Sequence, residues 1–178
     1  MVEPFPEMAA SQASDAPDGQ GRPPLTDSLQ DYLEAVYLLV HRHGMARMKE
    51  IASLVGVSRS SATGGVQALA ERGLVNYDPY EYVTLSERGE LAGRDLVRRH
   101  RVLKAFLMKV LGVPEAEAER VGCKMEHAIK GDVLERFVRF LEFIDRESAR
   151  NGSWREAFEA FSNGRAFDGS GDAKEAEA

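Results

Sequence analysis

Residues 46–75, ARMKEIASLVGVSRSSATGGVQALAERGLV, constrain the fold more than any other stretch of the chain. A short helical pattern runs through Leu54, a break follows at Gly56, and Ser58 is the expected N-cap of a second helix that reaches about Arg72. Two short helices joined by such a turn are typical of a helix-turn-helix. Taken alone, this pattern is a weak indicator of DNA binding.

The neighbouring segments strengthen the prediction. Residues 27–43 place apolar side chains at helical spacing, with Thr26 as the expected N-cap. After the helix pair, LVNYDPYEYVTL contains two strand-like runs, 74–77 and 82–85, joined around residues 78–79, and is predicted to form a β-hairpin. A helix, a helix pair and a hairpin in this order describe a winged helix, which favours DNA binding over a generic helical domain.

The second helix of the pair begins with short hydroxyl side chains, which suit contacts with phosphates and base edges at a helix N-terminus. The alternative is that the serines only cap and solvate the helix. Gly64 and Gly65 are unexpected there, because each destabilises a helix by roughly 0.5–1 kcal/mol relative to Ala. Close approach to DNA or to a neighbouring helix would explain them. The candidate DNA-binding residues are Ser58, Arg59, Ser60, Ser61 and Thr63.

The net charge of −6 neither supports nor excludes a nucleic-acid partner, because the charge is unevenly distributed. Residues 1–24 carry one Arg and four acidic residues, and residues 148–178 carry four basic and six acidic residues, so the segment between them is nearly neutral. Five of the seven prolines lie in residues 1–24, which are predicted to be a disordered leader. The tail over residues 148–178 is predicted to be partly disordered.

Past the hairpin, the pattern predicts three more helices, over residues 86–112, 115–130 and 132–147. Thr84 and Glu87 are expected to form a capping box for the first of them. The last has a wide apolar face, for which self-association is the expected use. The first is expected to present a basic surface made of Arg94, Arg98, Arg99 and Arg101.

The only cysteine of the chain, Cys123, precedes Glu126 and His127 by three and four positions. Positions i, i+3 and i+4 share a helix face, so a thiolate, a carboxylate and an imidazole are expected within reach of one metal ion. The alternative for the cysteine alone is a small buried apolar residue.

Three further candidate metal ligands lie earlier in the sequence than Cys123. Asp31 and Glu34 stand at i and i+3 on the first predicted helix, and His100 lies on the long helix after the hairpin. Each has an alternative interpretation, because an acidic pair is often a solvated helix face and a single histidine is often a surface residue.

The order of these parts in residues 25–147 resembles the diphtheria toxin repressor and manganese transport regulator family of metal-dependent repressors. The resemblance rests on SLQDYLEAVYLL, on IASLVGVSRSSATGGVQALAERGLV followed by YDPYEYVTLSERG, on RRHRVLKAFL and on CKMEHAI. It implies a mainly α fold, with an N-terminal winged helix-turn-helix over residues 25–87 and an all-helical metal-binding and dimerisation domain over residues 88–147. The SH3-like domain of longer members is expected to be absent.

The resemblance also implies a function. The chain is expected to be a homodimeric repressor of metal-uptake genes that binds a double-stranded DNA operator containing an inverted repeat. Two Mn(II) or Fe(II) ions per subunit are the expected corepressors. The family pattern assigns Asp31, Glu34, His100 and Glu126 to one ion and Glu34, Glu126, His127 and residue 123 to the other, with both glutamates bridging.

The sequence departs from the family pattern in two places. Cys123 matches the iron-responsive members and Asp31 matches the manganese-responsive ones, so the site is a hybrid. Lys104 and Glu119 replace the acid and the histidine of a second, ancillary iron site, which is therefore expected to be lost or altered.

The sequence also bears on the location of the protein and on alternative functions. No apolar run approaches the roughly 20 residues of a transmembrane helix, and the N-terminus lacks the features of a signal peptide, so a cytoplasmic location is expected. A metal-independent winged-helix regulator, sensing an organic ligand or the redox state through Cys123, is the main alternative. A metalloenzyme is disfavoured, because the candidate ligands are all needed for coordination and no further His, Lys or Ser constellation supplies a base or nucleophile. We therefore expect no enzymatic activity.

Overall fold

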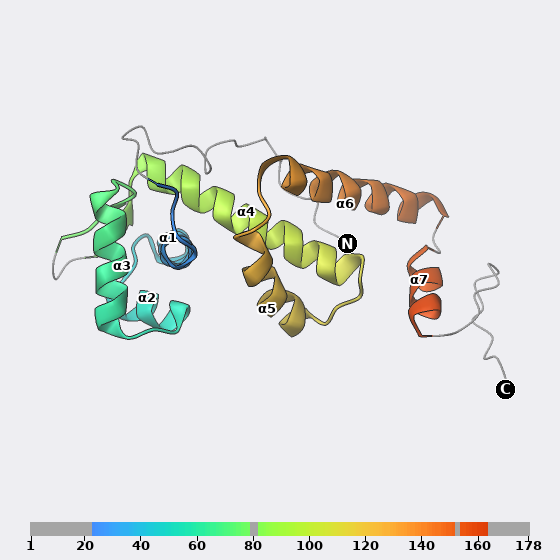
Figure 1. Cartoon of the computed structure of the whole chain (residues 1–178), viewed down its shortest axis with the longest axis horizontal. Helices are drawn as coiled ribbons and strands as arrows, with labels where there is room; N and C mark the ends of the chain where they lie inside the picture. Colours follow the sequence, from blue (N-terminus) through green and yellow to red (C-terminus); the bar gives the residue numbers. More distant parts are fainter. Residues whose placement is uncertain (1–22, 79–81, 152–153, 164–178) are drawn as a thin grey trace. The chain divides into compact units, whose positions relative to one another are not determined.

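The computed structural model describes residues 23–78, 82–151 and 154–163. The predicted leader, apart from its last two residues, and the end of the predicted tail lie outside this part of the chain. The described residues are mainly helical, as predicted, with one two-stranded sheet (Figure 1). The elements are α1 (Asp27–His43), α2 (Met48–Val55), α3 (Arg59–Glu71), β1 (Val75–Asn76), β2 (Thr84–Leu85), α4 (Glu87–Lys109), α5 (Glu115–Glu126), α6 (Gly131–Asn151) and α7 (Trp154–Ser162).

The chain divides into two compact units. The first contains the described residues up to His100 together with Glu126–Lys130, and the second contains Arg101–Met125 and the described residues from Gly131 onward. The expected domain boundary after residue 87 stays a prediction. Of the helices that the structure describes, none combines the length and the hydrophobicity that a bilayer crossing requires.

The first unit has one apolar core, to which α1, α2, α3 and the hairpin all contribute. Apolar side chains at i, i+3 and i+4 along α1 point into it, which is the periodicity that predicted the helix. Burial of each such side chain contributes about 1.5–3 kcal/mol to the free energy of unfolding. The fully buried members are Leu33, Val36, Ala46, Ile51, Ala62, Val66, Leu69 and Val83.

The helix-turn-helix is confirmed at its caps. α2 is followed by Gly56, whose φ of 76° is a left-handed conformation that glycine adopts without strain, and its N–H donates to the carbonyl of Ala52 at 3.0 Å. Ser58 then accepts a hydrogen bond from the N–H of Ser61 at 3.1 Å and caps α3. α1 likewise begins after its predicted cap, Thr26.

The hairpin is shorter than predicted. Val75 pairs with Leu85 and Asn76 with Thr84 in an antiparallel ladder of two residues per strand. Val83, expected to continue this ladder, instead exchanges both backbone hydrogen bonds with Ala46, each at 2.9 Å. The segment before α2 therefore pairs with the edge of the second hairpin strand that faces away from β1.

The predicted capping box of α4 is wrong. Thr84 lies in β2, where its hydroxyl accepts a hydrogen bond from the Asn76 side chain at 3.2 Å. Ser86 caps α4 instead: its Oγ accepts the N–H of Gly89 at 3.0 Å and contacts the carbonyl of Leu74 at 3.0 Å. One hydroxyl thus caps the helix and joins it to the hairpin.

The ends of α5 and α6 differ from the predicted ones. α5 ends at Glu126 rather than at residue 130, and α6 extends to Asn151 rather than to residue 147. α7 lies within the segment that was predicted to be a partly disordered tail. The apolar pattern of this helix was too short to predict it, because the helix has only nine residues and lies between Gly152 and Gly164.

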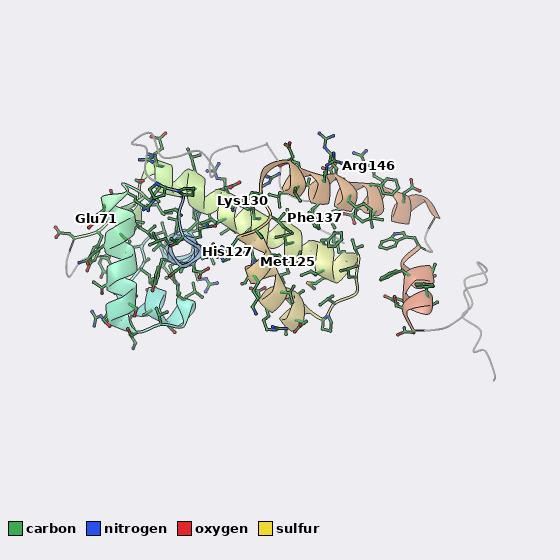
Figure 2. All side chains as sticks on the ribbon, in the orientation of Figure 1. Glu71, Met125, His127, Lys130, Phe137 and Arg146 are labelled. Carbon is green, nitrogen blue, oxygen red and sulfur yellow. The ribbon has the colours of Figure 1, made fainter. Side chains whose placement is uncertain are left out.

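α4 and α6 pack through aromatic side chains in the second unit. The rings of Phe106 and Phe137 meet edge to face with centroids 4.8 Å apart, and Figure 2 shows Phe137 on the side of α6 that faces α4. The predicted apolar face of α6 is only partly buried. Leu134, Val138 and Leu141 are buried, whereas two other members, Val133 and Phe140, are exposed, as is Phe143, which was not part of the predicted face.

Candidate metal centre

Five candidate ligands meet inside the first unit. α1 supplies Asp31 and Glu34 one turn apart, and the first-unit part of α4 ends at His100. Glu126 is the last residue of α5, and His127 follows it directly. They form two groups, in each of which one ligand atom per residue lies within 4.8 Å of the others. The groups are Asp31 with Glu126 and His127, and Glu34 with His100 and Glu126.

In the first group, the imidazole of His127 lies against α1 (Figure 2). Its Nε2 is 3.2 Å from Oδ1 of Asp31 and 4.0 Å from Oε1 of Glu126. Its Nδ1 is 3.4 Å from Oε1 of Gln30, whose own amide donates to the carbonyl of Leu25 at 3.0 Å. The amide therefore orients the ring so that Nε2 is directed at the carboxylates, the arrangement typical of a metal-ligating histidine.

Gln30 was not among the residues predicted to form the site. A signal was present, because Gln30 stands three residues before Leu33 and four before Glu34, on the side of α1 that faces the core. A polar residue at such a position needs a partner when it is buried, and Gln30 is only 5% exposed.

In the second group, Nδ1 of His100 lies 2.7 Å from Oε2 of Glu126. The Glu126 side chain is 1% exposed and that of His100 is 12% exposed. Burial, and after it the negative charge of the neighbouring Glu126 carboxylate, raises the pKa of Glu34 to about 7. Burial also raises the pKa of Asp31, against the opposing effect of His127.

These features fit a divalent cation. Three carboxylates crowd together with two imidazoles, and the raised pKa values of Asp31 and Glu34 show that their negative charge is poorly compensated by the protein. Oxygen and imidazole donors suit Mn(II) and Fe(II). Glu126 belongs to both groups and has one carboxylate oxygen facing each, so it is placed to bridge two ions.

The pairing of ligands differs from the one that the family pattern assigns. Asp31 meets His127 rather than His100, and Glu34 meets His100. The two acids are three residues, or about 4.5 Å, apart along the axis of α1, so each contacts the histidine at its own level.

Cys123 belongs to the second unit and is exposed on α5, which contradicts the interpretation as a buried apolar residue. Cys123 and His127 were expected to share one helix face. Because α5 ends at Glu126, His127 lies beyond the helix and the two residues do not share a face. The cysteine's part in metal binding stays a prediction. At the expected ancillary positions, Nζ of Lys104 forms an ion pair with Glu119 at 2.7 Å.

The basic surface predicted on α4 is smaller than expected. Arg99 is buried, with 2% of its side chain exposed, and pairs with Asp95 on the same helix. Arg94 is exposed but pairs with Glu90 at 3.6 Å. Arg101 is exposed.

The start of α3 presents the predicted hydroxyl groups. The Oγ of Ser58 lies 2.8 Å from that of Ser60 and 2.9 Å from that of Ser61, and all three side chains are exposed, as is Arg59. Thr63 differs, because its hydroxyl donates to the carbonyl of Arg59 at 2.9 Å. Three exposed hydroxyl groups are thus grouped at the N-terminus of this helix.

Comparison with known proteins matches both units to one family. Residues 24–83 match the model described as iron dependent repressor, N-terminal DNA binding domain, and residues 86–155 match its metal binding and dimerisation domain. An uncharacterized HTH-type transcriptional regulator of Methanocaldococcus jannaschii is 34% identical over 119 residues, which are 66% of this chain and 95% of that protein. The HTH-type transcriptional regulator MntR of Shouchella clausii is 33% identical over 131 residues, 74% of this chain and 91% of that protein.

Solved structures give the same result. The manganese regulator SloR matches with a TM-score of 0.59 and 28% identity, over 67% of this chain and 55% of its own. A manganese-dependent transcriptional repressor in complex with manganese matches with a TM-score of 0.59 and 33% identity, over 65% of this chain and 53% of its own. This chain thus spans about half the length of these two solved chains. From the two matched domains and the two relatives, we conclude that the chain belongs to the iron-dependent repressor family of metal-dependent, DNA-binding transcriptional regulators.

Proposed function

We propose that the chain is a metal-responsive repressor of metal-uptake genes, with Fe(II) or Mn(II) as its corepressor. The observation that supports this most strongly is that two groups of metal-ligating side chains share Glu126 and lie in the same compact unit as α3 and the hairpin. The manganese in the names of the solved relatives is consistent with the oxygen and imidazole donors of these groups.

The proposed site holds two ions per subunit, with Glu126 shared between them. Cys123, one helical turn before Glu126 in the sequence, is proposed as a further ligand on the basis of the family pattern. A thiolate favours Fe(II) over Mn(II), whereas the carboxylates suit both ions. The complete set of proposed ligands is Asp31, Glu34, His100, Cys123, Glu126 and His127.

α1 provides a physical route from this site to the recognition helix. Next to Asp31 on α1, the Tyr32 ring lies so close to Gly65 of α3 that a Cβ added there would be 2.3 Å from the ring. A bound divalent ion would supply the positive charge that offsets the repulsion between the carboxylates. When Asp31 and Glu34 are drawn toward Glu126, α1 is held in one position and α3 moves with it, so metal occupancy biases the placement of α3.

The proposed DNA contacts are at the start of α3. Ser58, Ser60 and Ser61 would face phosphates and base edges in the major groove, and Arg59 would add positive charge. In a homodimer, two copies of α3 match grooves one helical turn of DNA apart, or a multiple of it. An inverted-repeat operator follows from the twofold symmetry.

The test is a fluorescence-anisotropy titration of the full chain on DNA from upstream of its own gene and of neighbouring transporter genes. Mn(II), Fe(II) under anaerobic conditions and Zn(II) are each compared with chelator. We expect Mn(II) or Fe(II) to tighten binding by about 5–150-fold, the usual range of an allosteric coupling. Equal affinity in chelator would overturn the proposal. The control variant Glu126→Ala is expected to lose the metal response and remain a dimer.

A further inference from the structure

α4 contains a buried ion pair whose two residues are not among the candidate metal ligands. Arg99 and Asp95 are 2% and 5% exposed. Nε and Nη2 of Arg99 lie 3.2 and 2.9 Å from the same carboxylate oxygen of Asp95. Burial of such a pair costs several kcal/mol per ion, and apolar residues of similar volume are often as stabilising or more so. Stability alone is therefore a weak reason for this pair.

Arg99 also faces the end of α5. Its Nη1 lies 3.5 Å from the main-chain oxygen of Glu126, the last residue of that helix. The final carbonyl groups of a helix lack partners within it and carry partial negative charge, so a cation there is favourable. The contact is long for a hydrogen bond, but the guanidinium carries a full charge and is buried beside the carbonyl.

The next residue of α4 contacts the same glutamate from its other end. His100 Nδ1 is 2.7 Å from the Glu126 carboxylate, while Arg99 faces the Glu126 carbonyl. Two consecutive residues of one helix thus fix both the main chain and the side chain of the residue that the two ligand groups share. His127 follows directly, so its position depends on the same anchor.

We propose that Arg99, oriented by Asp95, is a positioning residue that holds the end of α5 against α4, so that Glu126 and His127 are in place before a metal ion binds. The inference rests on the proposed function, because it concerns the same metal site. Residues that orient metal ligands in this way typically change metal affinity by about 10–100-fold when they are replaced.

The test separates positioning from simple stabilisation. In Asp95→Leu/Arg99→Met, an apolar pair replaces the ion pair, so the melting temperature of the metal-free protein is expected to stay near that of the wild type. The same variant has no donor for the Glu126 carbonyl, and we expect it to bind Mn(II) about 10–100-fold more weakly by calorimetry. Arg99→Lys retains a cation that can reach the carbonyl, and should show intermediate affinity.

The matched control is Arg94→Gln, which removes an exposed ion pair one turn earlier on the same helix and should leave Mn(II) affinity unchanged. Wild-type Mn(II) affinity in the folded double variant would overturn the inference. If that variant does not fold, the neutral pair Asp95→Asn/Arg99→Gln is judged by the same criterion. If neither double variant folds, Arg99→Lys decides: equal Mn(II) affinity and equal hydrogen exchange at residues 126–130 to the wild type would overturn the inference.

Failure of the proposed function gives a different result. A wild-type chain that binds neither Mn(II) nor Fe(II) would remove the metal site itself, whatever the variants do. A wild type that binds Mn(II) with an affinity unaffected by the loss of Arg99 would leave the metal site in place and remove only the positioning role.

Discussion

The two adjacent glycines of α3 are explained by different surroundings. Gly65 is buried against Tyr32 of α1, where an added Cβ would be 2.3 Å from the ring. Gly64 is exposed, and an added Cβ there would meet no described atom within 4 Å. Packing against a neighbouring helix therefore accounts for Gly65. For Gly64, close approach of DNA stays a prediction, which is compatible with its exposure.

This difference predicts opposite effects of alanine at the two positions. Gly64→Ala should raise the free energy of unfolding by about 0.5–1 kcal/mol and weaken operator affinity. Gly65→Ala should lower the free energy of unfolding by about 1–3 kcal/mol, because the methyl group overlaps Tyr32. Urea unfolding and fluorescence anisotropy measure the two quantities. Unchanged operator affinity in Gly64→Ala would show that DNA does not approach α3 at this residue.

The raised pKa of Glu34 predicts a pH dependence of the metal-free protein. The pKa is about 7 in the folded chain against an ordinary 4.5, so the folded state binds the proton more tightly than the unfolded state does. Its contribution to stability is complete below about pH 4.5 and is lost as the pH rises to about 7. In Glu34→Gln this loss is absent, so the variant should gain roughly 1–3 kcal/mol on the wild type between about pH 5 and pH 8.

The measurement is urea unfolding of both proteins in chelator across this pH range. The difference between them cancels the titration of groups that do not interact with Glu34. A difference in unfolding free energy that does not change with pH would contradict the assignment to Glu34.

The proposed role of Cys123 gives a third prediction. If its thiolate contributes to metal binding, Cys123→Glu should shift activation toward Mn(II) relative to Fe(II), because a carboxylate is a harder ligand. Operator affinity against free metal, measured anaerobically, gives the ratio for each protein. An unchanged ratio with intact dimerisation would mean that this exposed cysteine does not select the metal.

At this scale, the candidate ligands could be predicted from the sequence because their chemistry is visible in residue type and spacing. Gln30 and Arg99 could not, since their roles depend on which backbone and side-chain atoms lie opposite them in the folded chain. From the sequence alone, Arg99 is predicted to be an exposed surface residue, because arginine is seldom buried. Only the structure shows that its side of α4 is buried.

At the scale of elements, local signals predicted helix starts better than helix ends. Thr26 and Ser58 cap their helices as expected, because a hydroxyl cap involves only residues within one turn. The end of α5 depends on contacts beyond the helix, and the pattern did not reveal it. At the start of α4, Thr84 was predicted as the N-cap in place of Ser86. The spacing of Thr84 and Glu87 fits a capping box, but Thr84 pairs with Asn76 in the hairpin and therefore cannot cap the helix.

The correct cap can be tested directly. Ser86→Ala should lower the free energy of unfolding by about 1–2 kcal/mol, because it removes the acceptor for the Gly89 N–H and the contact with the Leu74 carbonyl. Thr84→Ala, two residues away, loses only a partly exposed contact with Asn76 and should cost less than about 1 kcal/mol. Chemical denaturation of both variants measures the free energy of unfolding. A larger decrease in Thr84→Ala than in Ser86→Ala would favour the predicted capping box of Thr84 and Glu87.

At the scale of the whole molecule, the order of elements was enough to predict the mainly α fold and the repressor family, because a winged helix followed by a helix with clustered ligands is a specific combination. The grouping of Glu126–Lys130 with the first unit was not predictable in the same way. It depends on contacts between residues about 100 positions apart, such as that of His127 with Gln30.

That grouping places the proposed metal ligands and the exposed apolar side chains of α6 in different units. The five ligands that meet in the structure all belong to the first unit, whereas the apolar side chains left exposed on α6 belong to the second. Val133, Phe140 and Phe143 are 52%, 42% and 55% exposed. The family's metal binding and dimerisation domain covers these residues, and we propose that this face contacts a second copy of the chain.

Phe143→Glu tests the assignment, because it places a charge on that face at an exposed position without removing a buried side chain. We expect the dimer dissociation constant to rise by at least about tenfold, the equivalent of one lost aromatic contact of about 1.4 kcal/mol. Mn(II) affinity should stay close to that of the wild type, while operator affinity falls because one copy reaches only one half-site. Glu142→Gln changes an exposed neighbour on α6 and serves as the control. Analytical ultracentrifugation and Mn(II) titration on the same samples give both quantities. An unchanged dimer would place the interface elsewhere, and a loss of Mn(II) affinity together with the dimer would show that metal binding requires the second copy.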